Sequence, residues 1–228
     1  KLKRYNLHTD LIDWIKAFLS GRKQRVHSNG VYSSWATVLS GIPQGSILGP
    51  LLFIICINDL PDGLNADSNI FLYADDAKLY RYISTSQDIS SLQDDINKLT
   101  TWTNEWLIKL NINKCKVVSY GRNVDHSYHY YINDVQLEQL DSISDLGVHF
   151  DSQLKFDNHI DENINKAYSF LGIIKRNFTY LSTDAFITLY KSLVRPHLEY
   201  AVQVWSPYSV AYIKKINKFK CEQLNNQV

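Results

Sequence analysis

The chain has 228 residues, 45% of them hydrophobic and 21% charged, and its formal net charge is +1 at pH 7. These values predict a globular protein that buries a core, with room for one domain and a small appendage. The longest apolar run, residues 51–57, is too short to cross a membrane, so no membrane partner is expected. The three cysteines are widely spaced and odd in number, which favours reduced thiols and an intracellular location, the nucleus included.

Charge is unevenly distributed along the chain. Residues 1–28 carry seven Lys or Arg against two acidic residues, residues 29–150 carry seven against fourteen, and residues 151–228 carry ten against seven. An acidic centre between basic flanks suits a site that holds cations and binds a polyanion, although a solvated surface gives the same pattern. Because the chain lacks methionine and starts at Lys1, we expect it to be a fragment of a longer reading frame.

The N-terminal segment predicts a helix followed by a hairpin. Apolar residues at three- and four-residue steps predict an amphipathic helix over 8–20. Weak alternation around Asn29-Gly30, a dipeptide that favours two-residue hairpin turns, predicts a β-hairpin over 24–39. The loop that follows, "GIPQGSILGPLLF" at 41–53, opens a helix expected from about residue 46 to residue 59.

The middle of the chain predicts a second hairpin and a long helix. The stretch "NIFLYADDAKLYRYI" at 69–83 has apolar residues on both sides of Ala-Asp-Asp, which predicts two short strands joined by a tight turn. Thr85-x-x-Asp88 matches a capping box, and the apolar stripe behind it, from Ile89 to Trp106, predicts an amphipathic helix.

Beyond this helix the pattern changes twice. Strands are expected over 116–121 and 128–149, and the period becomes helical from Asp157 onward. We therefore predict an α+β domain over residues 1–150 and an all-α domain over residues 151–228.

Asp75 and Asp76 are the first candidates for chemistry. Aspartate is a favoured turn residue, so a structural role at the hairpin tip is an open alternative. Two adjacent carboxylates repel each other unless a cation lies between them, and hard oxygen ligands suit Mg²⁺ bound together with substrate phosphates. A two-metal site uses such carboxylates to activate an attacking oxygen and to stabilise a leaving oxygen.

The glycine-rich loop is the second candidate. Glycine lets a backbone approach a ligand without a Cβ in the way, and a helix starting near Ser46 would direct free N–H groups at an anion or a base. Gln44 is the one amide side chain that this loop presents. A simple turn remains the structural alternative.

Together these stretches resemble the reverse transcriptases of non-LTR retrotransposons of the LINE and jockey-like kind. The resemblance rests on "SGIPQGSILGPLLFIICINDLP" followed by "FLYADDAKLY", and it continues in order along nearly the whole chain. It includes "LIDWIKAFLSGRKQRV" before the loop and "LQDDINKLTTWTNEWLIKLNINKCK", "DLGVHFD" and "HLEYAVQVWSP" after the hairpin. The resemblance implies a partial right-hand polymerase palm in residues 1–150 and a helical thumb in residues 151–228.

The resemblance also implies roles for residues in the first half of the chain. Asp75 and Asp76 match the metal-binding pair of the family, which holds Mg²⁺ or Mn²⁺, and Tyr73 would lie beneath the primer end. Pro43, Gln44 and Gly45 match the motif that lies under the incoming nucleotide and its template partner. The implied partners are an RNA template, a DNA primer, deoxynucleoside triphosphates and upstream parts of the same polyprotein.

Further roles fall in the second half. Lys114 matches the lysine thought to assist the pyrophosphate leaving group, with Lys116 as the near alternative. Leu146 and Gly147 match the hairpin that grips the primer.

One departure from the family pattern limits the expected activity. The family places a third metal-binding aspartate in an F-x-D-x-x-x-A-F-D stretch upstream of the first helix, and we expect the chain to start after that point. The similar stretch "HFDSQLKFD" at 149–157 follows the Asp75-Asp76 hairpin, so we interpret it as structural. The chain alone is therefore expected to be inactive, whereas its full-length parent would copy RNA into DNA. The alternatives are an inactive remnant that only binds nucleic acid and a purely structural α+β protein.

Three other patterns have weaker cases. His126 and His129 have H-x-x-H spacing, but no nearby ligand completes a metal set, which favours surface histidines. Trp102 and Trp106 are four residues apart with leucines and are expected in the core instead of in a base-stacking platform. The four lysines near the C-terminus suit either phosphate contacts or a solvated helix face, and these are Lys214, Lys215, Lys218 and Lys220.

Overall fold

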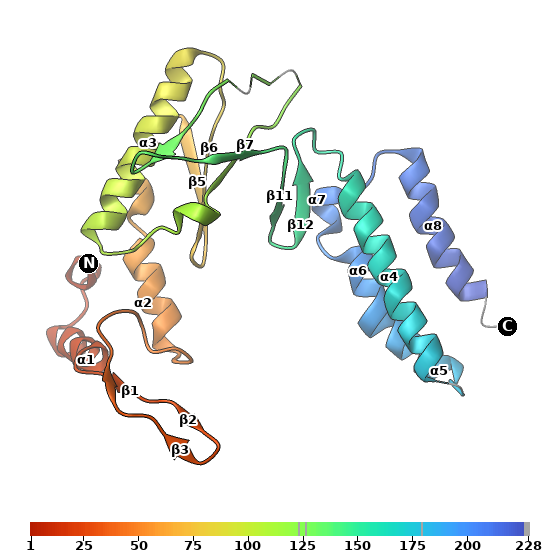
Figure 1. Cartoon of the computed structure of the whole chain (residues 1–228), viewed down its shortest axis with the longest axis horizontal. Helices are drawn as coiled ribbons and strands as arrows, with labels where there is room; N and C mark the ends of the chain where they lie inside the picture. Colours follow the sequence, from red (N-terminus) through yellow and green to blue (C-terminus); the bar gives the residue numbers. More distant parts are fainter. Residues whose placement is uncertain (123, 126, 179, 226–228) are drawn as a thin grey trace. The chain divides into compact units, whose positions relative to one another are not determined.

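The structure is a computed structural model that describes residues 1–122, 124–125, 127–178 and 180–225. The chain forms two compact units, residues 1–110 and residues 111–228 (Figure 1). It is a mixture of helices and strands, which confirms the α+β class. Residue 151, where the strands end, lies inside the second unit, and the predicted domain boundary there stays a prediction.

The first unit begins with a short helical segment and a β-hairpin. The elements are η1 (Leu2–Tyr5), α1 (Thr9–Leu19), β1 (Lys23–Gln24), β2 (His27–Ser28), β3 (Val31–Tyr32) and β4 (Ala36–Thr37). β1 pairs with β4 and β2 with β3, both antiparallel, around the turn at Asn29 and Gly30. Both turn residues have positive φ, 50° and 78°, the pattern of a type I′ turn. The predicted helix and hairpin are therefore confirmed.

The rest of the first unit contains the second hairpin between two helices. The elements are α2 (Leu48–Ile57), η2 (Leu60–Gly63), β5 (Ser68–Tyr73), β6 (Asp76–Arg81) and α3 (Ser86–Glu105). The Thr85 hydroxyl accepts the Asp88 N–H while the Asp88 carboxylate accepts the Thr85 N–H, so the predicted capping box starts α3. Helix α2 begins at Leu48, two residues later than expected.

Polar residues occupy much of the interior of the first unit. Its buried large apolar side chains are Ile15 and Leu60 among the residues that the structure describes. Helix α3 buries Asp95, Thr100 and Thr103 instead of its apolar stripe. Some apolar side chains of α2 and β5 are exposed, with 54% for Ile54 and 63% for Phe71, and most of the others are half-buried. Hydrogen bonds and ion pairs are therefore prominent among the tertiary contacts of this unit.

The second unit starts with short strand pairs. The elements are η3 (Ile112–Lys114), β7 (Lys116–Val118), β8 (Tyr131–Ile132), β9 (Val135–Gln136), β10 (Glu138–Leu140), β11 (Ser142–Asp145) and β12 (Val148–Asp151). β8 with β9 and β11 with β12 form antiparallel hairpins, whereas β7 and β10 pair in parallel. The strands predicted within 116–121 and 128–149 are thus confirmed as short two-stranded pairs.

The helices of the second unit enclose its apolar core. They are α4 (Asp157–Asn177), α5 (Thr183–Leu189), the π-helical turn η4 (Tyr190–Val194), α6 (Arg195–Glu199), α7 (Val202–Trp205) and α8 (Val210–Asn225). Helix α4 packs against η4, α6 and α8 (Figure 1). Its buried face follows the predicted helical period through Ile160, Ile164, Ala167, Leu171 and Ile174. Across the part of the chain that the structure describes, every helix is too short or too polar to span a lipid bilayer.

A buried histidine joins the strands of the second unit to α4. His159 is 3% exposed, and its Nδ1 accepts the backbone N–H of His149 at 3.2 Å. Its Nε2 lies 2.9 Å from the Asn163 amide, and its ring packs edge-on against Trp205. Burial lowers the pKa of His159 below its ordinary value. Because Nδ1 accepts a hydrogen bond, the packed side chain is the neutral form.

We therefore expect acid to destabilise the second unit through His159. The unfolded state binds a proton to this histidine more readily than the folded state, so the free energy of unfolding falls as pH drops below about 6.5. Urea unfolding followed by circular dichroism at pH 7.5 and 5.5 measures this fall, which His159→Gln should reduce. The exposed His129→Gln serves as the control and should leave it unchanged. If the free energy of unfolding fell equally in all three proteins, the destabilisation by acid would not come from His159.

Candidate functional site

The predicted acidic pair lies at the tip of the β5–β6 hairpin. The last strand pair joins Tyr73 to Asp76, so Ala74 and Asp75 form a two-residue turn. Ala74 has a φ of 51°, a left-handed conformation that an L-residue with a Cβ rarely adopts. The chain accepts this strain where the two aspartates meet, and such strain is often found at functional sites.

Both carboxylates are available for a ligand. Asp75 and Asp76 are exposed, and within the described ranges neither side chain has a hydrogen bond or ion pair. Adjacent carboxylate oxygens with unused lone pairs fit the preference of Mg²⁺ or Mn²⁺ for hard oxygen ligands. A cluster of three or more metal-ligating side chains is not found among the described residues. The chemistry of the two aspartates therefore fits part of a cation site.

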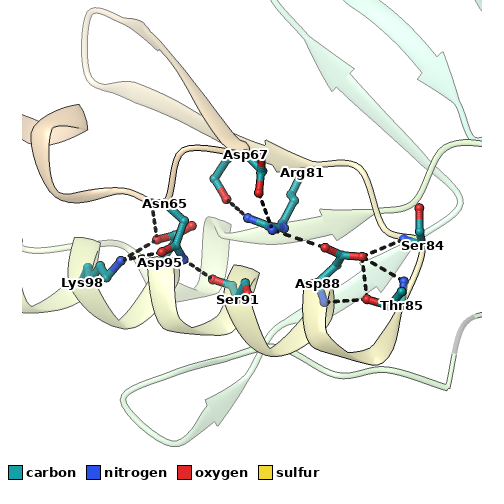
Figure 2. A network of polar contacts seen from close by, with 10 residues as sticks. Asn65, Asp67, Arg81, Ser84, Thr85, Asp88, Ser91, Asp95 and Lys98 are labelled. Carbon is teal, nitrogen blue, oxygen red and sulfur yellow. Dashed lines mark hydrogen bonds and ion pairs between the residues drawn. The ribbon is translucent and has the colours of Figure 1, made fainter.

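The opposite end of the same hairpin is fixed by a buried arginine. Arg81 pairs with Ser68 across the strands, and its side chain is 8% exposed. Its guanidinium donates to the Ser68 hydroxyl at 3.2 Å, to Asp67 at 3.2 Å and to Asp88 at 3.3 Å (Figure 2). Since Asp88 belongs to the capping box of α3, one side chain joins both strands to the helix start.

Asp88 has further donors around it. The Thr85 hydroxyl and the backbone N–H groups of Ser84 and Thr85 lower the pKa of Asp88 to about 2. The carboxylate is therefore ionised at neutral pH and paired with Arg81. It also accepts the backbone N–H groups of Ser84 and Thr85, which have no partner within the helix.

A second carboxylate holds the middle of α3. Asp95 is 0% exposed, and its Oδ1 accepts the Asn65 N–H at 3.0 Å and the Lys98 ammonium at 3.1 Å (Figure 2). Burial opposes ionisation, but the Ser68 hydroxyl, the Asn65 N–H and the Lys98 ammonium lower the pKa of Asp95 below its ordinary value. The segment that leads into β5 is thereby attached to α3 at a second point.

The loop with Pro43, Gln44 and Gly45 is shaped by its neighbours. Ser46 donates its hydroxyl to the Pro43 carbonyl at 2.7 Å and accepts the Gly49 N–H at 3.0 Å. A Cβ on Gly49 would lie 2.9 Å from the Ser46 hydroxyl and 3.2 Å from the Pro43 carbonyl, so this position requires glycine. Gly45 has a φ of 77°, and Gln44 is exposed. Free N–H groups are expected at this helix start, and one of them, the Gly49 N–H, is bonded to the Ser46 hydroxyl.

Arg22 fixes the start of the loop. Its Nε donates to the Leu19 carbonyl at 2.9 Å, and its Nη2 donates to the Gly41 carbonyl. Sequence reasoning missed the positioning roles of Arg22, Ser46 and Gly49. The serine three residues before a helical glycine was an available signal for the last two, whereas the contact of Arg22 with Gly41 spans nineteen residues.

The predicted primer-grip residues form the turn of the β11–β12 hairpin in the second unit. Leu146 and Gly147 have φ values of 44° and 79°, and they connect Asp145 to Val148. Tyr200 donates its hydroxyl to the Leu146 carbonyl at 2.8 Å. A Cβ on Gly147 would lie 3.3 Å from the Tyr200 ring, so the tyrosine packs under the turn.

A protein family profile described as reverse transcriptase (RNA-dependent DNA polymerase) matches residues 1–181. The chain belongs to the reverse transcriptase family. The residues matched include both hairpin turns and the glycine-rich loop described above.

Curated relatives of this chain come from mobile elements of flies. It is 31% identical to the RNA-directed DNA polymerase from mobile element jockey of Drosophila funebris, over 96% of this chain and 25% of that protein. It is 28% identical to the probable RNA-directed DNA polymerase from transposon X-element of Drosophila melanogaster, over 89% of this chain and 23% of that protein. It is also 28% identical to the probable RNA-directed DNA polymerase from transposon BS of the same fly, over 84% of this chain and 22% of that protein. The chain thus spans about a quarter of their length, and the jockey-like resemblance is confirmed. No solved structure matches the chain significantly.

The structure distinguishes the two lysines that the resemblance left open. Lys114 ends η3 and is exposed, and in the described part of the chain its ammonium has no partner. The Lys116 ammonium is 2.5 Å from Glu138, across the parallel pair of β7 and β10. Lys114 is therefore the freer group to meet an anionic substrate.

Two of the weaker candidates have structural partners. Asp151, in the "HFDSQLKFD" stretch, accepts the backbone N–H groups of Gln153, Lys155 and Phe156, which agrees with a structural interpretation. Lys215 pairs with Asp161 at 2.5 Å and holds α8 to α4.

The histidine and tryptophan candidates have mixed outcomes. His126 lies outside the described residues, and His129 is exposed. The core interpretation of the tryptophans is only partly right, because Trp102 is half-buried and Trp106 is 38% exposed. The Lys1 ammonium lies over both rings, 4.3 Å and 3.9 Å from their centroids. These ring faces are therefore occupied by a cation of the chain itself.

Ala74→Gly should stabilise the first unit. Left-handed backbone costs an L-residue about 1–2 kcal/mol, whereas the extra freedom of unfolded glycine costs about 0.5–1 kcal/mol. We expect a net gain of about 0.5–1 kcal/mol in the free energy of unfolding, measured with urea. Ala77→Gly, in β6 where φ is not positive, is the control and should lose stability. A loss at both positions would mean that the turn is not strained.

Gly147→Ala should destabilise the second unit. The added Cβ lies 3.3 Å from the Tyr200 ring, and the alanine has to adopt a left-handed backbone conformation. We therefore expect the free energy of unfolding to fall by about 1–2 kcal/mol. Gly172→Ala is the matched control, because Gly172 lies in α4 with no atom within 4 Å of the added Cβ. Helix propensity predicts a gain of up to about 1 kcal/mol there. Thermal unfolding of both variants measures the two effects. The packing of Tyr200 under the turn would be contradicted if Gly147→Ala were no less stable than Gly172→Ala.

Proposed function

We propose that the chain is the palm and thumb part of an RNA-directed DNA polymerase that copies an RNA template from a DNA primer. The observation that carries the proposal is the exposed Asp75-Asp76 pair at a strained turn, within a chain of the reverse transcriptase family. The palm would comprise residues 1–150 and the thumb residues 151–228. The remaining site would come from upstream parts of the same polyprotein, since the relatives are about four times longer.

Asp75 and Asp76 would hold Mg²⁺ or Mn²⁺ through their free oxygens. When bound, the metal neutralises charge on the attacking and leaving oxygens of nucleotidyl transfer. The strained turn and the buried anchor at Arg81 hold the two carboxylates at one end of a fixed hairpin, which supports this role. Tyr73, exposed on the last strand pair, would lie beneath the primer end.

The other residues would position the substrates. Pro43, Gln44 and Gly45 would lie under the deoxynucleotide and its template base, with the exposed Gln44 amide free to donate and accept. Lys114 would meet the pyrophosphate as a point charge. The rigid turn of Leu146 and Gly147 would grip the primer.

A cation test examines the site without any other part of the polyprotein. Paramagnetic Mn²⁺ added to the chain should broaden the NMR signals of backbone amides around Asp75 and Asp76. Asp75→Asn with Asp76→Asn should abolish the broadening, because both oxygen donors to the cation become amides. The turn at Asp134 is a built-in control, since it also presents an exposed aspartate in a two-residue hairpin turn but has no second carboxylate beside it. Equal broadening at both turns would refute a specific cation site.

A polymerase test examines the activity. Residues 1–228 alone should extend no primer, because the hairpin tip contributes two carboxylates and the described residues form no cluster of three metal-ligating side chains. Small misplacements of reacting groups cost about a hundredfold in rate. A polypeptide that includes the upstream reading frame should extend a DNA primer on RNA, and Asp75→Asn should reduce extension at least about a hundredfold while duplex binding stays nearly unchanged. Binding without any extension by the longer protein would favour the second candidate, an inactive element that only binds nucleic acid.

A further inference from the structure

The β1–β4 hairpin is a basic and aromatic surface that none of these roles uses. Every residue from 23 to 37 is exposed. The stretch from Trp14 to Asn58 contains four Lys or Arg and no acidic residue. The hairpin is thus positively charged without local compensation, which suits a polyanion.

Strand pairing gathers its rings and its arginine on one face. His27 lies opposite Tyr32, and their rings stack with centroids 4.2 Å apart. Between the two strand pairs, three residues, 33–35, oppose two, 25–26, so one strand carries an extra residue, as in a β-bulge. This offset brings Trp35 alongside Arg25, whose guanidinium lies 3.8 Å from the Tyr32 centroid and 4.6 Å from the Trp35 centroid.

Stacking holds the Arg25 guanidinium while leaving its donors unused. A planar guanidinium that lies over rings presents its N–H groups at the edge of the stack. Within the ranges that the structure describes, Arg25 has no hydrogen bond or ion pair. Phosphate oxygens are the acceptors that such a fork binds in a bidentate manner. Immobilising the side chain in advance reduces the entropy lost on binding.

The rings beside Arg25 remain accessible. Trp35 is 60% exposed and Tyr32 is 53% exposed. Proteins that bind single strands combine basic side chains along the backbone with aromatic rings on which bases stack. A duplex cannot use these rings in the same way, because its bases are already stacked on each other.

We propose that this hairpin binds single-stranded nucleic acid, with a base stacked on Trp35 and a phosphate held by Arg25. The surface is separate from Asp75 and Asp76, and its binding needs neither nucleotide nor divalent cation. RNA and DNA strands share the chemistry that it recognises.

Fluorescence anisotropy with the whole chain and EDTA tests the proposal. The probes are labelled single-stranded RNA and DNA of about 15 nucleotides and the matching duplex. Single strands should bind more tightly than the duplex, and binding should weaken as salt rises from about 50 to about 200 mM. Tighter binding of RNA would assign the surface to a template-like strand, and tighter binding of DNA to a primer-like strand.

Matched variants distinguish the hairpin from general charge and stacking. Trp35→Ala should weaken single-strand binding by about tenfold. Trp35→Phe keeps an aromatic ring and should retain most of the binding, which separates loss of stacking from misfolding of the hairpin. Trp14→Ala is the control, since Trp14 is 52% exposed on α1 and packs against Phe18. Arg25→Lys should weaken binding because the planar fork is lost while the charge remains, and exposed Arg4→Ala should have less effect.

Two results would overturn the proposal. One is single-strand binding that is unchanged by both Trp35→Ala and Arg25→Lys. The other is a duplex bound as tightly as a single strand, which would indicate phosphate attraction without stacking. Neither result bears on cation binding at Asp75 and Asp76, so failure here is distinguishable from failure of the polymerase proposal.

Discussion

The buried Arg81 guanidinium is the contact on which the arrangement of the first unit depends. It joins the two strands of the acidic hairpin at their open end and pairs with Asp88 at the start of α3. A charge held at 8% exposure is costly to leave unpaired, so the hairpin and the helix cannot separate without exposing or stranding it. Because few apolar side chains are buried nearby, this polar link positions the hairpin on the helix, whereas an apolar core positions the helices of the second unit.

Much of the local structure could be predicted from the sequence because short-range signals are strong. Asn29-Gly30 specifies a turn with positive φ at both residues, and Thr85 with Asp88 specifies a helix start. The helical period of α4 gave its buried face correctly. The acidic pair at the hairpin tip followed from alternation on both sides of Ala-Asp-Asp.

The contacts that fix the site could not be predicted in the same way. Tyr200 reaches the Leu146 carbonyl from fifty-four residues away, and nothing in the local pattern of either segment indicates this partner. Asp95 interrupts an apolar stripe that predicted an ordinary core-facing helix, yet it is the residue that is fully buried. Periodicity reports which face of an element is apolar, but it does not report where a buried charge finds its partners.

Ala74 affects how precisely the two carboxylates at the hairpin tip are positioned. With a Cβ, the left-handed basin is narrow, so once folded the turn has few neighbouring conformations to visit. Glycine would relieve the strain but would widen the range of backbone angles, and the directions of the two carboxylates would spread with them. A cation held by oxygens on adjacent residues is sensitive to that spread. The strained alanine thus exchanges a little folding free energy for a lower conformational entropy of the two carboxylates, from which the proposed cation site would benefit.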